Sequence, residues 1–196
     1  MTQIGNAIVQ HARQWAGRSC KETRVNGGSC IDDLQIAYGG TTSREAYCAK
    51  FVWVVVDQAC KEIGIVSTLP KTAGARDMRD RSKGRLPMDQ NFTVGSCFYR
   101  YSTAPSASGH MGIVVDVTPD ALITVEGNNG NRIGVFENKL SAVRDTRNGW
   151  VAIHTDMIPG GQMPYGVQFA KAGNDALILL ALLGGGIFVA KKKRLI

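Results

Sequence analysis

The sequence predicts an α+β fold in which N-terminal helices pack on an antiparallel β-sheet, followed by an apolar C-terminal helix. Its 196 residues, 44% hydrophobic and 20% charged, suffice for one packed domain and a short appendage. Up to residue 64 the apolar side chains recur at three- and four-residue steps, whereas between residues 94 and 154 they alternate. Helices followed by strands are the order typical of an α+β fold.

Three helices are expected before the sheet. Residues 1–17 form an amphipathic pattern that lacks the continuous apolar stretch of a secretory signal. Residues 31–38 suit a short helix, and residues 45–64 a long one that ends at Gly64, where a capping glycine is expected. The charged segment 70–87 is predicted to be partly helical and to lie on the surface.

Four strands are expected after these helices, because each stretch has period-two hydrophobicity between turn residues: 94–101, 112–117, 122–126 and 150–154. The pattern ends near residue 158. We therefore expect one packed domain over residues 1–158, a linker over 159–173 and an apolar tail helix with a basic end over 174–196.

Most of the net charge of +7 comes from two places. Residues 191–194 contribute +4 and residues 71–85 another +4, which leaves −1 for the rest of the chain. A basic end beside an apolar run is typical of a membrane boundary rather than of a phosphate-binding face, so nucleic acid is not an expected partner. Segment 71–85 suits either an acidic polymer or an ordinary solvated surface.

The apolar stretch 176–190 is the basis for the predicted tail helix. As a helix it would rise about 22 Å, which is short of the roughly 30 Å hydrocarbon core of a bilayer, and three glycines at 184–186 weaken it. Snorkelling lysines would narrow that gap. A membrane anchor is the preferred interpretation, and the alternatives are a helix packed on a partner protein or on its own domain.

Five cysteines leave at least one thiol outside any intramolecular disulfide. Cys20 and Cys30 flank a glycine-rich loop and could pair in an oxidising compartment, but the sequence leaves this open. Cys60 and Cys97 have the setting of small buried hydrophobic residues. No paired spacing suggests a zinc site, and no dense carboxylate loop suggests calcium.

Two residues stand out as candidates for chemistry. Cys48 lies in the first turn of the long helix, where unpaired N–H groups and the helix dipole favour a thiolate. His110 begins an apolar strand between Gly109 and Gly112, which would let another chain or a substrate approach the imidazole. His11 and His154 lack such a setting and are interpreted as a helix-face and a strand-end residue.

Glu126 and Asn128 follow at the end of the next strand. A hairpin with a three-residue loop at 118–120 would pair Gly112 with Glu126 and place His110, Glu126 and Asn128 on one face. A two-residue loop at 119–120 would put Glu126 on the other face unless a bulge intervened. The hypothesis therefore requires an odd loop or a bulge.

These groups suffice for thiol catalysis on an amide without metal or organic cofactor. Cys48 would attack the carbonyl, His110 would take the thiol proton and return it to the leaving amine, and Glu126 or Asn128 would hold the imidazole in the working tautomer. The backbone N–H of Cys48 is the expected oxyanion donor.

Residues 4–155 resemble the CHAP domains, cysteine- and histidine-dependent amidohydrolases/peptidases of the papain-like class. The motifs are YCAKFV around Cys48, SGHMGIVV around His110 and VEGNN with Glu126 and Asn128, in the order and spacing of that family. Tyr47 stands where the family often has Trp, and Val-Gly-Ser at 94–96 where it often has Pro-Gly-Asp. Neither departure removes a catalytic group.

The resemblance implies that Cys48 is the nucleophile, His110 the general base, Glu126 the orienting residue and Asn128 a fourth polar group of the site. It implies a papain-like fold and a peptidoglycan substrate, cut either as an N-acetylmuramoyl-L-alanine amidase or as an endopeptidase. A smaller branch of the family hydrolyses glutathionylspermidine.

A wall hydrolase with a membrane tail and no signal peptide indicates a bacteriophage component. It would be virion-associated, with virion proteins as partners, and open the wall during entry, or it would be a lysis enzyme at the host membrane. The alternatives are a non-catalytic adaptor with a CHAP-like fold and a cytoplasmic amidase acting on a small thiol-peptide conjugate.

Overall fold

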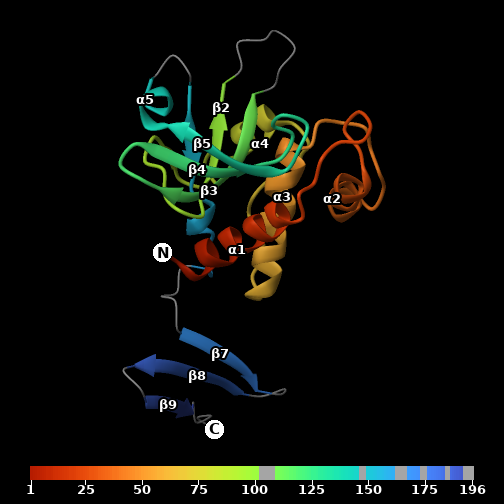
Figure 1. Cartoon of the computed structure of the whole chain (residues 1–196). Helices are drawn as coiled ribbons and strands as arrows, with labels where there is room; N and C mark the ends of the chain where they lie inside the picture. Colours follow the sequence, from red (N-terminus) through yellow and green to blue (C-terminus); the bar gives the residue numbers. More distant parts are fainter. Residues whose placement is uncertain (102–108, 146–148, 162–166, 173–175, 184–185, 192–196) are drawn as a thin grey trace. The chain divides into compact units, whose positions relative to one another are not determined.

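The computed structural model describes residues 1–101, 109–145 and 149–161 in full, and the backbone of residues 167–172, 176–183 and 186–191. The chain divides into two compact units, Met1–Gln162 and Met163–Ile196. In the first unit four helices precede a six-stranded sheet in which all neighbouring strands are antiparallel (Figure 1). This confirms the predicted α+β order.

The helices of the first unit follow the predicted periodicity: α1 (Gln3–Gly17), α2 (Ser29–Gly39), α3 (Cys48–Glu62) and α4 (Ala75–Ser82). The Thr2 hydroxyl caps α1 by accepting a hydrogen bond from the Gly5 N–H. After α3, Gly64 has a φ of 75°, the left-handed conformation predicted for a capping glycine. All three helices expected before the sheet are confirmed.

The strands pair in the order β1-β6-β2-β3-β4-β5. Their bounds are β1 Met88–Asp89, β2 Cys97–Arg100, β3 His110–Val117, β4 Ala121–Glu126, β5 Gly134–Lys139 and β6 Val151–Ile153. A short helix, α5 (Leu140–Val143), and a 3-10 turn, η2 (Thr155–Met157), complete the unit. Strands β1 and β5 were not predicted, because β1 has only two residues and β5 carries Glu, Asn and Lys.

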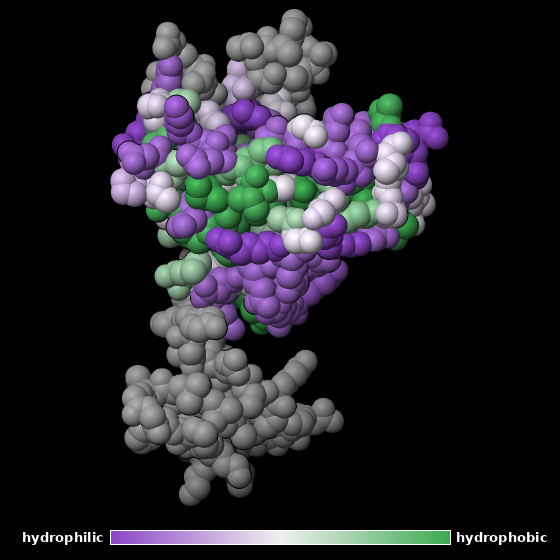
Figure 2. All heavy atoms as spheres, viewed as in Figure 1, coloured by the Kyte–Doolittle hydropathy of each residue, from purple (hydrophilic) through white to green (hydrophobic). Residues whose placement is uncertain are grey.

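Alternate residues of β2 and β3 enter two hydrophobic clusters. Cys97, Tyr99, Met111 and Ile113 join the main core with α1 and α3, whereas Phe98 and Val114 join a smaller cluster with Trp150. Figure 2 shows one face of this unit, where hydrophilic side chains predominate and hydrophobic ones gather in a band across the middle. The sheet is therefore covered on both faces.

The β3–β4 hairpin has the register that the site hypothesis requires. Gly112 pairs with Glu126, as predicted, and Val117 pairs with Leu122. The register shifts by one residue between Val114 and Asp116, and the Thr118 N–H donates to the Ala121 carbonyl across the turn. A bulge with a tight turn, rather than a three-residue loop, therefore brings Glu126 to the face of His110.

The cysteines behave as two groups. Cys20 and Cys30, whose Cα atoms lie 5.4 Å apart, form a disulfide. It links the loop after α1 to the first turn of α2. Cys60 and Cys97 are buried free thiols, as predicted, and burial raises the pKa of each. The pairing that the sequence left open is thus present in the structure.

The second unit corrects the predicted tail helix. It forms an antiparallel sheet of β7 (Val167–Ala172), β8 (Ala176–Leu183) and β9 (Gly186–Lys191), and β7 occupies part of the expected linker. An apolar run without periodicity suits a buried strand as well as a helix, and glycines at 184–186 interrupt the helical alternative. Over the residues that are described, no helix has the length and hydropathy needed to cross a membrane.

Candidate active site

Cys48 is the first residue of α3, with Tyr47 at the N-cap position. Its side chain is only 6% exposed. The first turn of the helix is formed by the Phe51 N–H, which donates a hydrogen bond to the Tyr47 carbonyl at 2.8 Å. The Cys48 N–H itself donates to no residue in the described ranges, so it remains available for an oxyanion.

His110 begins β3 and contacts the carboxylate of Glu126 at the end of β4. The distance from His110 Nε2 to Glu126 Oε2 is 2.8 Å, and the carboxylate is fully buried. Because Nε2 is used by Glu126, Nδ1 is the ring nitrogen left for another partner. The interaction of the imidazole with Cys48 is consistent with this assignment.

Three further side chains hold the Glu126 carboxylate. Asn129 Nδ2 donates to Oε2 at 2.7 Å, while Oε1 accepts from the Thr124 hydroxyl and from Asn138 Nδ2 at 3.2 Å. A buried carboxylate with this many donors has a fixed position. The residue that orients His110 is therefore itself oriented.

The protonation of the pair follows from these contacts. Burial lowers the pKa of His110, but hydrogen bonds and charge interactions with Cys48 and Glu126 outweigh it and raise the pKa to about 9. Burial raises the pKa of Glu126, but the bonds from His110, Thr124 and Asn138 outweigh it and the pKa is lowered. An imidazolium beside a carboxylate is therefore the expected state at neutral pH.

The two glycines around His110 lie close to neighbouring side chains. A Cβ on Gly112 would lie 2.8 Å from Glu126 Cγ and 2.6 Å from Phe98 Cε1. Gly109, with a φ of 89°, lies against the Tyr99 ring. These glycines make room for Glu126, Phe98 and Tyr99.

Asn128 lies next to these residues without joining the hydrogen-bond network. It has a φ of 59°, in the turn after β4, and its side chain makes no hydrogen bond to the part of the chain that is described. The amide that contacts Glu126 belongs to Asn129 instead. The structure thus brings Cys48, His110 and Glu126 together, whereas the partly exposed Asn128 forms no side-chain hydrogen bond with any of the three.

Sequence reasoning missed the three residues that hold Glu126. Asn129 stood in the VEGNN motif, and Thr124 lies two residues before Glu126 on the same face of β4. Asn138 had no signal because its strand was not predicted. Of the three, only Thr124 could have been found from the sequence, because it lies two residues before Glu126 on the same strand and therefore on the same face.

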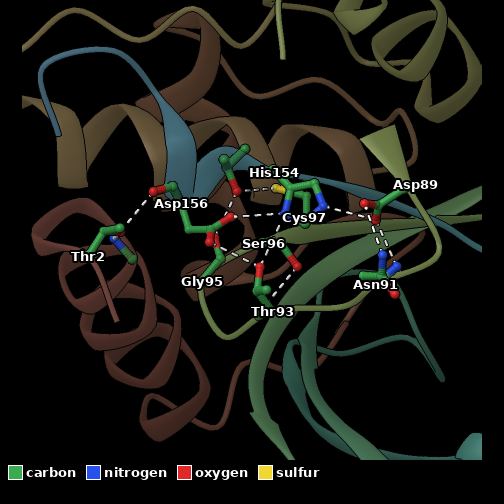
Figure 3. Close-up of polar contacts among 11 residues, drawn as sticks. Thr2, Asp89, Asn91, Thr93, Gly95, Ser96, Cys97, His154 and Asp156 are labelled. Carbon is green, nitrogen blue, oxygen red and sulfur yellow. Dashed lines mark hydrogen bonds and ion pairs between the residues drawn. The ribbon is translucent and has the colours of Figure 1, made fainter. Parts of the chain in front are cut away.

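The other histidines have no free nitrogen facing a thiol. His11 Nε2 lies 2.8 Å from Glu62 Oε2 between α1 and α3. His154 is held at both ring nitrogens: Nε2 lies 3.0 Å from Asp89 Oδ1, and Nδ1 lies 3.3 Å from the Thr93 hydroxyl and 3.5 Å from Asp156 Oδ1 (Figure 3). Nearby, the buried Cys97 thiol contacts Thr155. His154 was predicted only as a strand-end residue.

No metal site accompanies these clusters in the described ranges, where no three His, Cys, Asp or Glu side chains are placed to hold an ion. The basic segment 71–85 is partly neutralised within itself, because Asp77 pairs with Arg81 and Asp80 with Arg79 and Lys83. The two aspartates are already counted in its net charge of +4, so the segment stays basic, with Lys71, Arg76 and Arg85 outside these ion pairs.

No protein-family model matches the sequence, and no curated protein matches it. Two solved structures are similar to the chain. One is the crystal structure of Ly7917, with a TM-score of 0.43 and 13% identity over 76% of this chain and 62% of the other, so the chain spans less than two thirds of that length. The second is Ly7917 with the hydrolyzing product of MDP, with a TM-score of 0.41 and 14% identity over 97% and 78%. Similarity at this level defines neither the family nor the activity of this chain.

Proposed function

We propose that this protein is a papain-like cysteine hydrolase of the CHAP type that cleaves an amide bond in peptidoglycan. The observation that carries the proposal is the arrangement of His110, whose Nε2 is bound by the buried Glu126 while the imidazole also interacts with Cys48 at the start of α3. A thiol, an imidazole and an orienting carboxylate are the three groups that thiol catalysis requires. The peptidoglycan substrate rests on the resemblance of the sequence motifs.

In this mechanism the reacting proton resides on His110 before substrate binds, because its pKa is raised to about 9. The Cys48 thiolate attacks the carbonyl carbon, and the Cys48 N–H stabilises the oxyanion. The imidazolium then protonates the leaving amine as the C–N bond breaks, leaving a thioester. Water, deprotonated by His110, attacks the thioester and releases the acid and the thiolate.

The proposal extends to the residues around these three groups. Glu126 stabilises the imidazolium that forms at each turnover, and Thr124, Asn129 and Asn138 keep that carboxylate in place. Asn128 is proposed as a polar group that meets the substrate, because it lies at the site and its side chain is not bound by the described residues. A phage virion or lysis setting remains a prediction from the sequence.

Incubating the full chain with purified peptidoglycan and identifying the released fragments by mass spectrometry tests this function. New stem-peptide or crossbridge termini are expected from the wild type and absent with Cys48→Ala. Cys60→Ala, which removes a buried thiol from the same helix, is the matched control and should retain cleavage. Equal cleavage by Cys48→Ala, or none by the wild type on several wall types, would refute the proposal.

A further inference from the structure

Arg100 occupies a position that the proposed mechanism does not use. It is the last residue of β2 and pairs directly with His110 of β3, so the two side chains leave the sheet on the same face. The guanidinium carbon lies 5.8 Å from the centre of the Trp150 ring, which is itself buried. Arg100 is therefore a half-buried cation beside the histidine of the site.

Aromatic rings connect the two cations. The Phe98 ring centre lies 4.8 Å from that of Trp150 and 6.1 Å from that of His110. Phe98 is fully buried and packs between them on this face. At this distance Trp150 makes a cation–π contact with the guanidinium, and an indole ring offers it no hydrogen-bond acceptor.

Among the described residues, Arg100 is also distinguished by having no acidic partner. Glu126, the acid on the same face, is fully buried and is already bound by His110, Thr124, Asn129 and Asn138. The sequence segments 102–108 and 146–148, which adjoin β2 and Trp150 along the chain, contain no Asp or Glu, and the nearest acid in the sequence, Asp145, forms an interaction of its own.

We infer that Arg100 binds a carboxylate of the substrate beside the scissile amide. A planar guanidinium held against a ring matches a carboxylate through two parallel hydrogen bonds. Free carboxyl groups are a regular feature of peptidoglycan stem peptides, and they become carboxamides when amidated. Resting on the proposed function, this inference names the form of substrate that the site selects: the free acid over the amide.

The chain offers a matched control in Arg76 of α4. Its guanidinium lies 5.5 Å from the ring centre of Tyr101, the residue after Arg100, and it too has no acidic partner in the part of the chain described. However, α4 contributes Ala75 and Met78 to the main core, on the face of the sheet opposite to Phe98 and Trp150. Arg76 thus has the same chemistry but lies on the sheet face that packs α3, not on the face that carries His110 and Arg100.

The test measures kcat/KM for two sets of disaccharide-peptide fragments of peptidoglycan, identical except that the stem-peptide carboxyl groups are free or amidated. The full-length wild type is expected to prefer the free acid roughly 10- to 100-fold, the range of a charge-assisted hydrogen-bond pair. Arg100→Gln should reduce that preference to about one by slowing only the free acid. Arg100→Lys should be intermediate, and Arg76→Gln should keep the wild-type ratio.

The outcomes separate this inference from the proposed function. If the wild type cleaves both sets equally, or if Arg100→Gln keeps the preference, the assignment of Arg100 is wrong while the hydrolase stands. If neither set is cleaved and Cys48→Ala binds neither by calorimetry, the proposed function fails and the inference fails with it. Unchanged cleavage of the amidated fragments by Arg100→Gln shows that the variant is folded.

Discussion

His110 and His154 lie at the ends of two strands of one sheet, and each faces a carboxylate within 3.0 Å. They differ in what their second nitrogen meets. His110 uses Nε2 for Glu126 and interacts with the Cys48 thiol, whereas His154 has Nδ1 near Thr93 and Asp156 as well as Nε2 near Asp89. Both nitrogens of each histidine therefore meet groups of the protein, but only the second nitrogen of His110 is left for a thiol, whereas that of His154 meets a hydroxyl and a carboxylate.

The carboxylates differ in the same way. Glu126 is fully buried and bound by four side chains, and it holds the histidine that the proposed mechanism uses. The side chain of Asp89 is 46% exposed, so water shares its charge. A short His–carboxylate distance therefore occurs in both clusters, so what singles out His110 as the candidate is the thiol beside it.

The largest expected effect separates the two histidines by substitution. His110→Gln should lower the rate of peptidoglycan cleavage by at least about 1000-fold, because the proton acceptor and donor is lost. His154→Gln should keep most of the activity and lower only the unfolding midpoint. The measurements are fragment release and thermal unfolding of both variants, and a loss of activity with His154→Gln in a folded protein would erase the comparison.

The second effect concerns the carboxylate of the site. Glu126→Gln should reduce activity roughly 10- to 100-fold, since it removes the charge that orients and stabilises the imidazolium. It should also lower the pKa of His110, which can be followed without substrate as the pH dependence of Cys48 alkylation by iodoacetamide. Glu62→Gln, which changes the His11–Glu62 pair, is the control and should leave both readouts unchanged.

The helices and the three central groups of the site could be predicted because their signals are local. Periodicity defines α1 and α3, and Cys48, His110 and Glu126 each lie in a short motif at a strand or helix end. Strand β5 and the tail could not be predicted. Strand β5 has no alternation of apolar and polar residues. The run 176–183 is apolar at every position, so its pattern suits a helix as well as a strand, and the pairing with neighbouring strands decides between them.

Contacts between distant segments account for the rest. Asn138 reaches Glu126 from β5, and the carboxylates around His154 come from β1 and η2, some 65 residues away in one case. The bulge at Val115 was foreseen only as one of two ways to satisfy the register. A single sequence carries the residue types of such networks but not the strand order that assembles them.

The pH dependence of stability is a third way to sharpen the comparison. The pKa of His110 is raised from 6.5 to about 9 in the folded protein, so its contribution is fully present below about pH 6.5 and is lost as the pH rises through 9. The urea concentration at the unfolding midpoint of the wild type should therefore decrease as the pH is raised from 6.5 to 9. This fall should persist in His154→Gln and disappear in His110→Gln, and a fall that persists in His110→Gln would assign it to another group.

The smallest expected effect lies in the second cluster. Asp89→Asn removes a carboxylate whose pKa is lowered chiefly by its hydrogen bond from His154, but the group is close to half exposed, so the pair contributes about 1 kcal/mol or less to the free energy of unfolding. Urea unfolding should show a small loss that shrinks in 0.5 M salt, with cleavage of peptidoglycan unchanged. Asp156 is nearly buried, so Asp156→Asn should destabilise more and respond less to salt. Loss of cleavage by a folded Asp89→Asn protein would mean that this cluster, and not only the one around His110, takes part in the reaction.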